Sequence, residues 1–190
     1  VGYSKKIIYR NQSNVNNDIY VTGNLGDSFI GLQILKNKIK LNKTKTKYFI
    51  NKYYMPDIQN KFSKNLFSLA TSSMDISDGL ITDLNKLINK QNVSYKIYEK
   101  FIPVSRNLTN LINSKNLKKI DLVSNGDDYQ ILFTAKPNNA RIINKLSKSL
   151  GVKISKIGTI LSGKNKSLIL DQKGREIANN VSGYVHQFWS

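Results

Sequence analysis

The sequence predicts an α/β or α+β fold in which helices pack on a mixed β-sheet in a single domain. Two observations support this prediction. Segments with strand character alternate with segments of helical periodicity. The chain has 190 residues, enough to bury one sizeable core, and no internal repeat or low-complexity linker divides it. We therefore expect one domain over residues 1–190.

The first elements are a strand, a glycine-rich turn and a helix. The strand is expected at 19–22, which is β-branched and aromatic, and the helix from Phe29, where apolar residues recur at helical spacing. Asp27 or Ser28 suits the N-cap of that helix, because either side chain can accept a hydrogen bond from a free helix amide. The turn at 23–28 lacks the Gly-Lys-Ser/Thr of a Walker A loop, so we assign it a structural role.

The rest of the chain continues this alternation. A helical pattern over 43–70 is divided by Pro56, after which Asp57 suits a new helix start. The later elements are expected as a strand at 72–76, a helix to about 89, a strand at 93–98, a helix at 104–113, a strand at 128–134, a helix at 138–150 with Gly151 as its C-cap, and strands at 152–161 and 167–170. The aromatic tail at 181–190 has no clear period.

The formal charge of +18 bears on the class of partner. Of the 30 basic residues only 4 are Arg, the residue that grips bases and phosphates in a bidentate manner. The lysines are spread from Lys5 to Lys173. We therefore expect a solvated lysine surface that attracts phosphates, and we do not expect nucleic acid as a partner. A basic nucleic-acid-binding domain stays as an alternative.

Residue types exclude several other classes. The chain has no cysteine, which excludes disulfides and thiolate metal sites, and its single histidine, His186, excludes a histidine cluster. We assign His186 a structural role. No apolar run of about 18 residues predicts a membrane span, and no signal-peptide pattern opens the chain. We expect a cytoplasmic protein with no membrane partner.

The hexapeptide Asp75-Ile76-Ser77-Asp78-Gly79-Leu80 lies where a strand is expected to end and a helix to begin. Side chains alternate along a strand, so Asp75 and Ser77 are expected on one side, with Asp78 at the junction. Ligands of open α/β sheets bind beyond the carboxyl ends of strands, and Mg²⁺ takes one or two carboxylates with water and phosphate oxygens. The hexapeptide therefore suits a magnesium–nucleotide contact, or alternatively a plain helix cap by Ser77 or Asp78.

Two further features carry possible chemistry. The segment Asn125-Gly126-Asp127-Asp128-Tyr129 precedes an alternating strand, and its paired acids suit a cation or a positively charged substrate, or alternatively a solvated turn. Arg10 precedes the first strand and suits a phosphate contact, or alternatively a plain surface position.

In this order and spacing the motifs resemble the C-terminal domain of thiamine-monophosphate kinases, within the wider aminoimidazole ribonucleotide synthetase-like group of ATP-dependent enzymes. The resemblance rests on residues 19–28, 74–84, 126–133 and 183–188, and it spans the chain from about 10 to 188. It implies the fold of that C-terminal domain.

The family transfers the γ-phosphoryl group of ATP to thiamine monophosphate, giving thiamine diphosphate. The contacts that the resemblance implies are Asp75 and Asp78 with Mg²⁺, Ser77 and Arg10 with ATP, and Asp127 and Tyr184 with the thiamine phosphate. A carboxylate and an aromatic ring both suit the cationic thiazolium. No catalytic side chain is implied, because direct phosphoryl transfer depends on positioning and charge stabilisation.

The chain also departs from the family. The position of Asp127 is usually Glu, and Met55 and Gln59 stand near Pro56 where the family tends to have arginines. The family has an N-terminal domain that supplies most metal-binding carboxylates and the dimer interface, and we expect residues 1–17 to be the segment leading from it. We therefore expect the 190 residues to be inactive alone and to act in a homodimer when joined to that domain. Another enzyme of the wider group, or a remnant that folds without catalysing, remains as an alternative.

Overall fold

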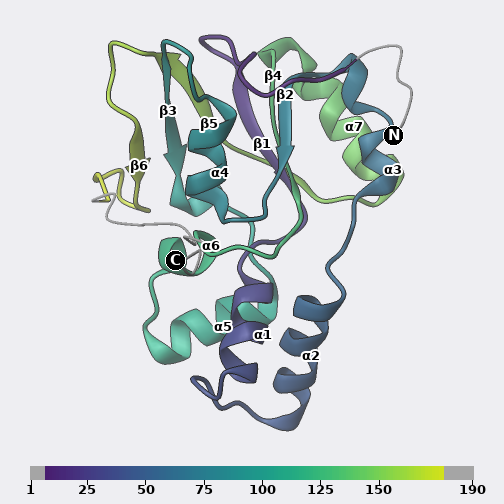
Figure 1. The fold of residues 1–190 in the computed structure, drawn as a ribbon, viewed down its shortest axis with the longest axis vertical. Helices are drawn as coiled ribbons and strands as arrows, with labels where there is room; N and C mark the ends of the chain where they lie inside the picture. The colour runs from purple at the N-terminus through teal and green to yellow at the C-terminus, as the bar shows by residue number, and fades with distance from the viewer. Residues whose placement is uncertain (1–6, 178–190) are drawn as a thin grey trace, which may run out of the picture.

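The computed structural model describes residues 7–177, and in it six strands form one mixed sheet (Figure 1). The order across the sheet is β2-β4-β1-β5-β3-β6, and every neighbouring pair is antiparallel except β3 and β6. The strands are β1 (Asp18–Thr22), β2 (Ala70–Asp75), β3 (Val93–Tyr98), β4 (Ile131–Ala135), β5 (Ile154–Ser162) and β6 (Leu168–Leu170). The predicted mixed sheet with helices packed on it is confirmed.

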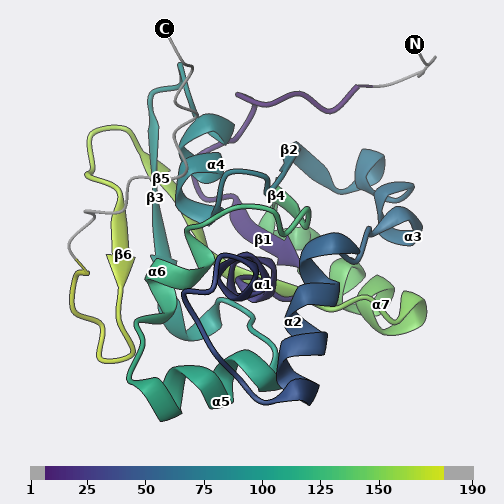
Figure 2. The same cartoon turned by 60° about the horizontal axis from the view of Figure 1, so that its bottom comes forward.

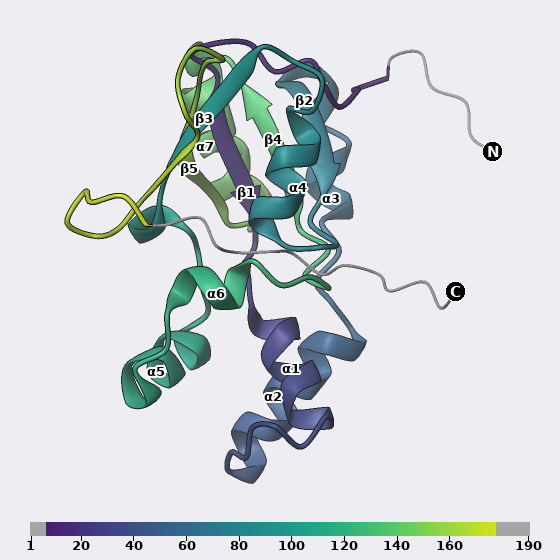
Figure 3. The same cartoon turned by 60° about the vertical axis from the view of Figure 1, so that its left-hand side comes forward.

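Helices occupy three places around the sheet. One face carries α4, the opposite face carries α3 and α7, and α1, α2 and α5 form a lobe at one end, with α6 between lobe and sheet (Figures 1 and 3). Their bounds are α1 (Asp27–Leu35), α2 (Lys43–Tyr54), α3 (Asn60–Ser63), α4 (Leu80–Leu87), α5 (Arg106–Lys115), α6 (Lys119–Val123) and α7 (Ala140–Leu150), with short 3₁₀ segments η1 (Leu66–Ser68), η2 (Glu99–Phe101) and η3 (Pro137–Asn139). None of the helices in this described part is long and apolar enough to cross a membrane.

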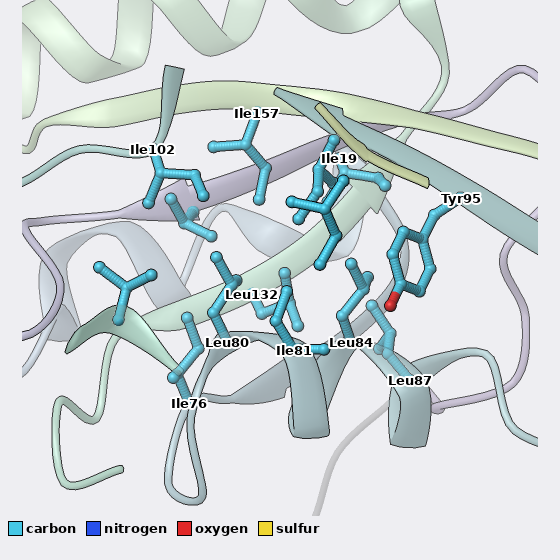
Figure 4. Close-up of a cluster of buried hydrophobic side chains, with 14 of the residues drawn as sticks. Ile19, Ile76, Leu80, Ile81, Leu84, Leu87, Tyr95, Ile102, Leu132 and Ile157 are labelled. Atoms are coloured by element: carbon cyan, nitrogen blue, oxygen red, sulfur yellow. The ribbon is translucent and has the colours of Figure 1, made fainter. Parts of the chain in front are cut away.

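Strand β1 contributes to the hydrophobic cores on both faces of the sheet. All of its residues are buried, and successive side chains point to opposite faces. Ile19 and Val21 join the cluster under α4, whereas Tyr20 joins the cluster under α3 and α7 and stacks on Phe133 with ring centroids 5.2 Å apart. Figure 4 shows the first cluster, in which α4 directs four side chains toward the sheet: Leu80, Ile81, Leu84 and Leu87. The helix next to the hexapeptide is therefore anchored to the central strand.

The lobe of α1, α2 and α5 has a small core of its own. Ile30, Phe49 and Leu108 are fully buried there. Gly31 allows α1 and α2 to approach closely, because a Cβ at this position would lie 2.3 Å from the carbonyl oxygen of Phe49. Figure 2 shows α1 nearly end-on between α2 and α5. The lobe is therefore a packed unit that can hold its side chains in defined positions.

Several boundary predictions are confirmed by the structure. Residues 93–98 form β3 as expected, 19–22 fall within β1, and the helix expected to end at Gly151 does so. Gly151 has φ of 63°, the left-handed conformation that favours glycine at a helix C-cap.

Other boundary predictions are wrong. No helix starts at Asp57: α3 covers only Asn60–Ser63, and Ala70 already belongs to β2, because Leu66 and Leu69 turn inward under the sheet. The N-cap of α1 is Gly26 and not Asp27 or Ser28. The carboxylate of Asp27 instead accepts hydrogen bonds from the hydroxyls of Ser105 and Tyr48, at 2.7 and 2.9 Å. Helix α6 is not predicted, because its five residues are too few to show a period.

A buried carboxylate joins the lobe to the sheet. Asp128, just before β4, is 3% exposed, and its Oδ2 accepts a hydrogen bond of 2.8 Å from the amide of Gly26 at the start of α1. Burial, together with the nearby charge of Asp27, raises the pKa of Asp128 to about 8. A negative charge at a helix start is favourable, but here the cost of burying the charge is larger.

Replacement of Asp128 by Asn is expected to remove part of the pH dependence of stability. A carboxyl group with a higher pKa in the folded chain binds more protons when folded, so its contribution to stability is present at low pH and is lost as the pH rises from about 4 to about 8. In that window the free energy of unfolding of the wild type should fall relative to D128N by up to about 1.4 kcal/mol per pH unit. Urea unfolding across this pH range measures the difference, and parallel profiles for the two proteins would contradict it.

Candidate functional site

The turn after β2 and the turn before β4 are joined by backbone hydrogen bonds. The strand pairing continues beyond β2, since the amide of Ile76 donates to the carbonyl of Gln130 at 2.8 Å and the amide of Tyr129 donates back to Ile76 at 2.9 Å. One step further, the amide of Asp127 donates to the carbonyl of Ser77 at 2.9 Å. The hexapeptide and the acidic segment are therefore parts of one structure, which we call the paired turns (residues 76–79 and 124–129).

Two glycines allow the paired turns to touch. A Cβ at Gly126 would lie 1.9 Å from the carbonyl oxygen of Ser77, and a Cβ at Gly79 would lie 2.0 Å from that of Ser124. Gly79 also has φ of 111°, a conformation that L-residues rarely adopt. Each motif therefore needs its glycine because the backbone of the other motif lies against it.

Asp83, in the first turn of α4, holds one of the paired turns in place. Its side chain is 0% exposed. Its Oδ2 accepts hydrogen bonds from three consecutive amides, those of Ser77, Asp78 and Gly79, at 2.9, 2.8 and 3.1 Å. Burial raises the pKa of Asp83, while the backbone hydrogen bonds and Lys86 act in the opposite direction. This carboxylate thus fixes the backbone that carries Ser77 and Asp78.

Lys86 supplies the counter-charge for two carboxylates of this region. Its Nζ forms an ion pair with Oδ2 of Asp78 and lies 3.1 Å from Oδ1 of Asp83. Removing such a cation from a buried acid is costly, because it leaves an uncompensated charge. Lys86 therefore belongs to the support of the site.

The charges of Asp75, Asp78 and Asp127 all act on Tyr129, and that of Asp78 also acts on Asp127. Burial and then the charge of Asp78 raise the pKa of Asp127, whereas Lys36 lowers it. The pKa of Tyr129 is raised by burial and then by the charges of Asp127 and Asp75, with a smaller effect from Asp78. The three acids therefore lie in one negatively charged region, which favours a bound cation.

Asp127 and Tyr129 adopt backbone conformations that cost free energy. Their φ angles are 70° and 50°, and a residue other than glycine held in this left-handed region costs on the order of 1–3 kcal/mol. The hydrogen bonds of the paired turns keep both residues there. Such strain is concentrated at functional sites.

A pocket of about 660 Å³ opens beside the paired turns. Ser77, Asp78 and Asp127 form its acidic side, and α1 and α2 form the facing wall with Phe29, Leu32, Gln33, Lys36 and Tyr53. The volume lies in the range of small-molecule sites. An acidic end, aromatic rings and a lysine together suit a ligand that carries a cationic ring and a phosphate.

The structure brings together four of the six site residues predicted from the sequence. Asp75 ends β2, and Ser77, Asp78 and Asp127 line the pocket. Arg10 does not lie with them: its neighbour Asn11 donates a hydrogen bond to the carbonyl of Leu87, at the far end of α4, roughly 12 Å along the helix from its start. Tyr184 lies outside the described residues.

The acids beside the pocket offer few of the ligands that a metal ion can take. Within residues 7–177 no group of three or more His, Cys, Asp or Glu side chains could hold a metal by itself. Mg²⁺ does not require such a group, because it keeps several waters and takes one or two carboxylates together with substrate phosphates. Asp75 and Asp78 fit that limited demand, and the repulsion that raises the pKa of Asp127 is of the kind that a cation relieves.

Three residues of the site are not singled out by the sequence motifs: Lys36, Tyr53 and Asp83. An acid inside the apolar stripe of α4, between Ile81 and Leu84, is a signal for Asp83, since an acid on a buried face must have partners. Lys36 and Tyr53 carry no such signal, because only the packing of α1 against α2 brings them to the paired turns.

The fold and the paired turns define the class of this protein. The family model for the AIR synthase related protein, C-terminal domain, matches residues 14–171, and the chain belongs to that family. The curated relatives narrow the class. The chain is 33% identical over 184 residues to a thiamine-monophosphate kinase of Buchnera aphidicola subsp. Schizaphis graminum, and 30% identical over 169 residues to that of Escherichia coli K12.

The relatives are longer than this chain. The matches cover 96% and 88% of the chain but only 56% and 51% of the two relatives, so the chain spans about half their length. Among solved structures, AaThiL complexed with AMPPCP and TMP matches 94% of the chain and 54% of its own length, with a TM-score of 0.76 and 24% identity. The predicted resemblance to the C-terminal domain of thiamine-monophosphate kinases is therefore confirmed.

Replacement of Asp83 by Ala should destabilise the protein by roughly 2–4 kcal/mol, because three consecutive amides, buried or partly buried, and Lys86 lose their common partner. Asp121→Ala is the matched control, since Asp121 is an exposed acid on α6 and should change stability by less than about 0.5 kcal/mol. Urea unfolding of the three proteins gives the comparison. Equal losses in both variants would show that Asp83 does not hold the turn.

Proposed function

We propose that this chain is the C-terminal half of a thiamine-monophosphate kinase, which transfers the γ-phosphoryl group of ATP to thiamine monophosphate. The observation that carries the proposal is the junction of the two acidic motifs into the paired turns beside one pocket. The named relatives cover nearly all of this chain and support the same activity. AaThiL, with its bound AMPPCP and TMP, supports a site for a nucleotide and a second phosphate-bearing ligand on this fold.

In this proposal Asp75 and Asp78 hold Mg²⁺ together with phosphate oxygens of the nucleotide. The ion, when bound, neutralises the charge that develops on the transferred phosphoryl group. The protein's part is to place the carboxylates. Asp83 fixes the backbone of Asp78, and Lys86 holds the Asp78 side chain through the ion pair. The ion pair uses Oδ2 of Asp78, so Oδ1 would be available to hold the metal ion.

Ser77 and Arg10 are the proposed ATP contacts. Ser77 lines the pocket next to Asp78, where its hydroxyl can donate to a phosphate oxygen. Arg10 is exposed near the other end of α4, so this role requires the nucleotide to extend along that helix from Ser77 toward Leu87. A charged guanidinium there would bind a distal phosphate or the ribose side.

Asp127 and Tyr184 are the proposed contacts of the thiamine phosphate. The carboxylate of Asp127 faces the pocket and suits the positive thiazolium, and Tyr53, Tyr129 and Phe29 offer ring faces for the two heterocycles. The Asp that replaces the usual Glu is one methylene shorter, and Tyr129 lies close enough to share the contact.

The remaining parts of the enzyme are also proposals. A preceding domain supplies the other metal-binding carboxylates and the dimer contacts, residues 1–17 lead from that domain, and the complete enzyme is a cytoplasmic homodimer of thiamine biosynthesis. The 190 residues alone then lack half of the active site, which agrees with their covering about half of the relatives' length.

Asp78→Asn in the full-length product of the gene should lower kcat/KM for Mg·ATP by about 100-fold or more, because a metal-binding charge at the transferred phosphoryl group is lost. Asp121→Asn, an exposed acid outside the pocket, is the control and should keep wild-type values. A coupled assay of thiamine diphosphate formation measures both. Wild-type turnover by D78N would contradict the proposal that Asp78 holds Mg²⁺. Turnover by the 190 residues alone would contradict the proposal that they lack half of the active site.

Asp127→Asn should raise KM for thiamine monophosphate by roughly 10-fold while KM for ATP changes little, because the variant removes only the charge that faces the thiazolium. The same coupled assay with each substrate varied in turn separates the two constants. An increase confined to KM for ATP would place Asp127 on the nucleotide instead.

A further inference from the structure

A second concave surface lies away from the paired turns. Two adjoining hollows of about 450 and 640 Å³ share Lys100, Phe101 and Lys156 in their walls and together follow η2 and β5. We call this surface the lysine groove, defined by Tyr98, Lys100, Phe101, Lys119, Lys153, Ser155, Lys156 and Thr159. It shares no lining residue with the acidic pocket. The groove therefore lies outside the site proposed for phosphoryl transfer.

Two lysines, Lys119 partly buried and Lys153 exposed, point to an anion in this groove. Burial lowers the pKa of Lys119; the charge of Glu99 raises it, and the charge of Lys153 has a smaller lowering effect. Burial also lowers the pKa of Lys153, against the charge of Asp27. Within residues 7–177 neither lysine forms an ion pair. The charges of Lys119 and Lys153 repel each other, and a bound anion would offset both this repulsion and the cost of partly burying Lys119.

The hydrogen bonds of Lys119 and Lys153 hold their ammonium groups in place but do not use all of the N–H donors. Nζ of Lys119 donates to the carbonyls of Glu99 and Ile102 at 2.7 and 3.2 Å, and Nζ of Lys153 donates to Oδ1 of Asn24 at 2.8 Å. An ammonium group has three donors. At least one N–H of each lysine is therefore available to a phosphate oxygen.

Aromatic rings stand between the lysines of the groove. Phe101 is 49% exposed, and its ring meets the ring of Tyr98 edge-on with centroids 5.7 Å apart. Nζ of Lys100 lies 4.9 Å from the Phe101 centroid, and Nζ of Lys96 lies 5.9 Å from that of Tyr98. An exposed ring flanked by positive charges is the arrangement on which single-stranded nucleic acid stacks its bases.

The lysines are spread along the sequence, but several of them cluster on one surface in the structure. The five lysines involved come from three separate segments of the chain, and the fold brings them to one surface: Lys96, Lys100, Lys119, Lys153 and Lys156. One of them, Lys156, is neutralised by Asp18 at 2.6 Å. The other four form no ion pair among the described residues, although the charges of Glu99 and Asp27 partly offset those of Lys119 and Lys153.

We propose that the lysine groove binds single-stranded nucleic acid, with phosphates on Lys119 and Lys153 and a base stacked on Phe101. A polymer of acidic residues alone would use the charges but not the exposed ring, whereas a polynucleotide uses both. The two adjoining hollows suit a chain that passes over Phe101 more than a compact ligand in one cavity. This inference does not depend on the proposed kinase function.

Fluorescence anisotropy with a labelled oligouridylate of about 12 nucleotides tests the charges first, near physiological ionic strength of about 0.15 M. The double variant Lys119→Ala/Lys153→Ala should bind about 10-fold more weakly, and the slope of log K against log salt should fall by about 1.4. The control is Lys43→Ala/Lys47→Ala, which removes the same charge from exposed positions of α2 and should change binding by less than about 2-fold. Equal losses in the two doubles would mean that net charge alone binds the oligonucleotide and would overturn the proposal.

Phe101→Ala tests the stacking contact and does not depend on whether the lysine variant folds. This variant should bind at least about 5-fold more weakly, because it loses a base–aromatic contact. Its salt slope should be unchanged, because the substitution removes no charge. Tyr54→Ala, which removes an exposed ring from α2, is the control and should bind like the wild type. Wild-type binding by F101A, or equal competition by polyglutamate, would overturn the proposal.

Asp127→Asn should leave oligonucleotide binding unchanged, so failure of the kinase proposal would be recognised separately.

Discussion

The functional face of this protein depends on one carboxylate, that of Asp83. A single buried oxygen accepts three consecutive amides, and these amides carry Ser77 and Asp78. Asp83 itself is held by α4, whose apolar stripe is anchored to the central strand β1 (Figure 4). The sheet core therefore holds α4, the first turn of α4 holds Asp83, and Asp83 fixes the backbone of Asp78, the proposed metal-binding acid.

The paired turns explain why two distant motifs act together. Gly79 and Gly126 are each in contact with the backbone of the opposite turn, and hydrogen bonds between the turns hold Asp127 and Tyr129 in left-handed conformations. The pairing of β2 with β4 continues directly into these turns. The result is an acidic patch of three carboxylates with Lys86 as an internal counter-ion, a net negative charge that a bound cation would reduce.

The sequence predicts the sheet, most helices and the two motifs, because strand alternation, helical stripes and glycine turns are local signals. The exceptions have tertiary causes. Leu66 and Leu69 continue a helical pattern, yet they pack under the sheet and end the helix early. Arg10 precedes the first strand, and only the fold places it at the far end of α4. Lys36 and Tyr53 reach the pocket through helix–helix packing, and the lysine groove gathers residues that the chain spreads widely.

The proposed function requires a divalent ion and a nucleotide to bind at the paired turns. Paramagnetic broadening in the full-length protein measures this binding, with Mn²⁺ in place of Mg²⁺ and AMPPCP as the nucleotide. The amide signals of Ser77, Asp78 and Asp127 should broaden while that of Phe101, in the lysine groove, stays sharp. Broadening of Phe101 with sharp signals at the paired turns would show that the ion and nucleotide bind elsewhere.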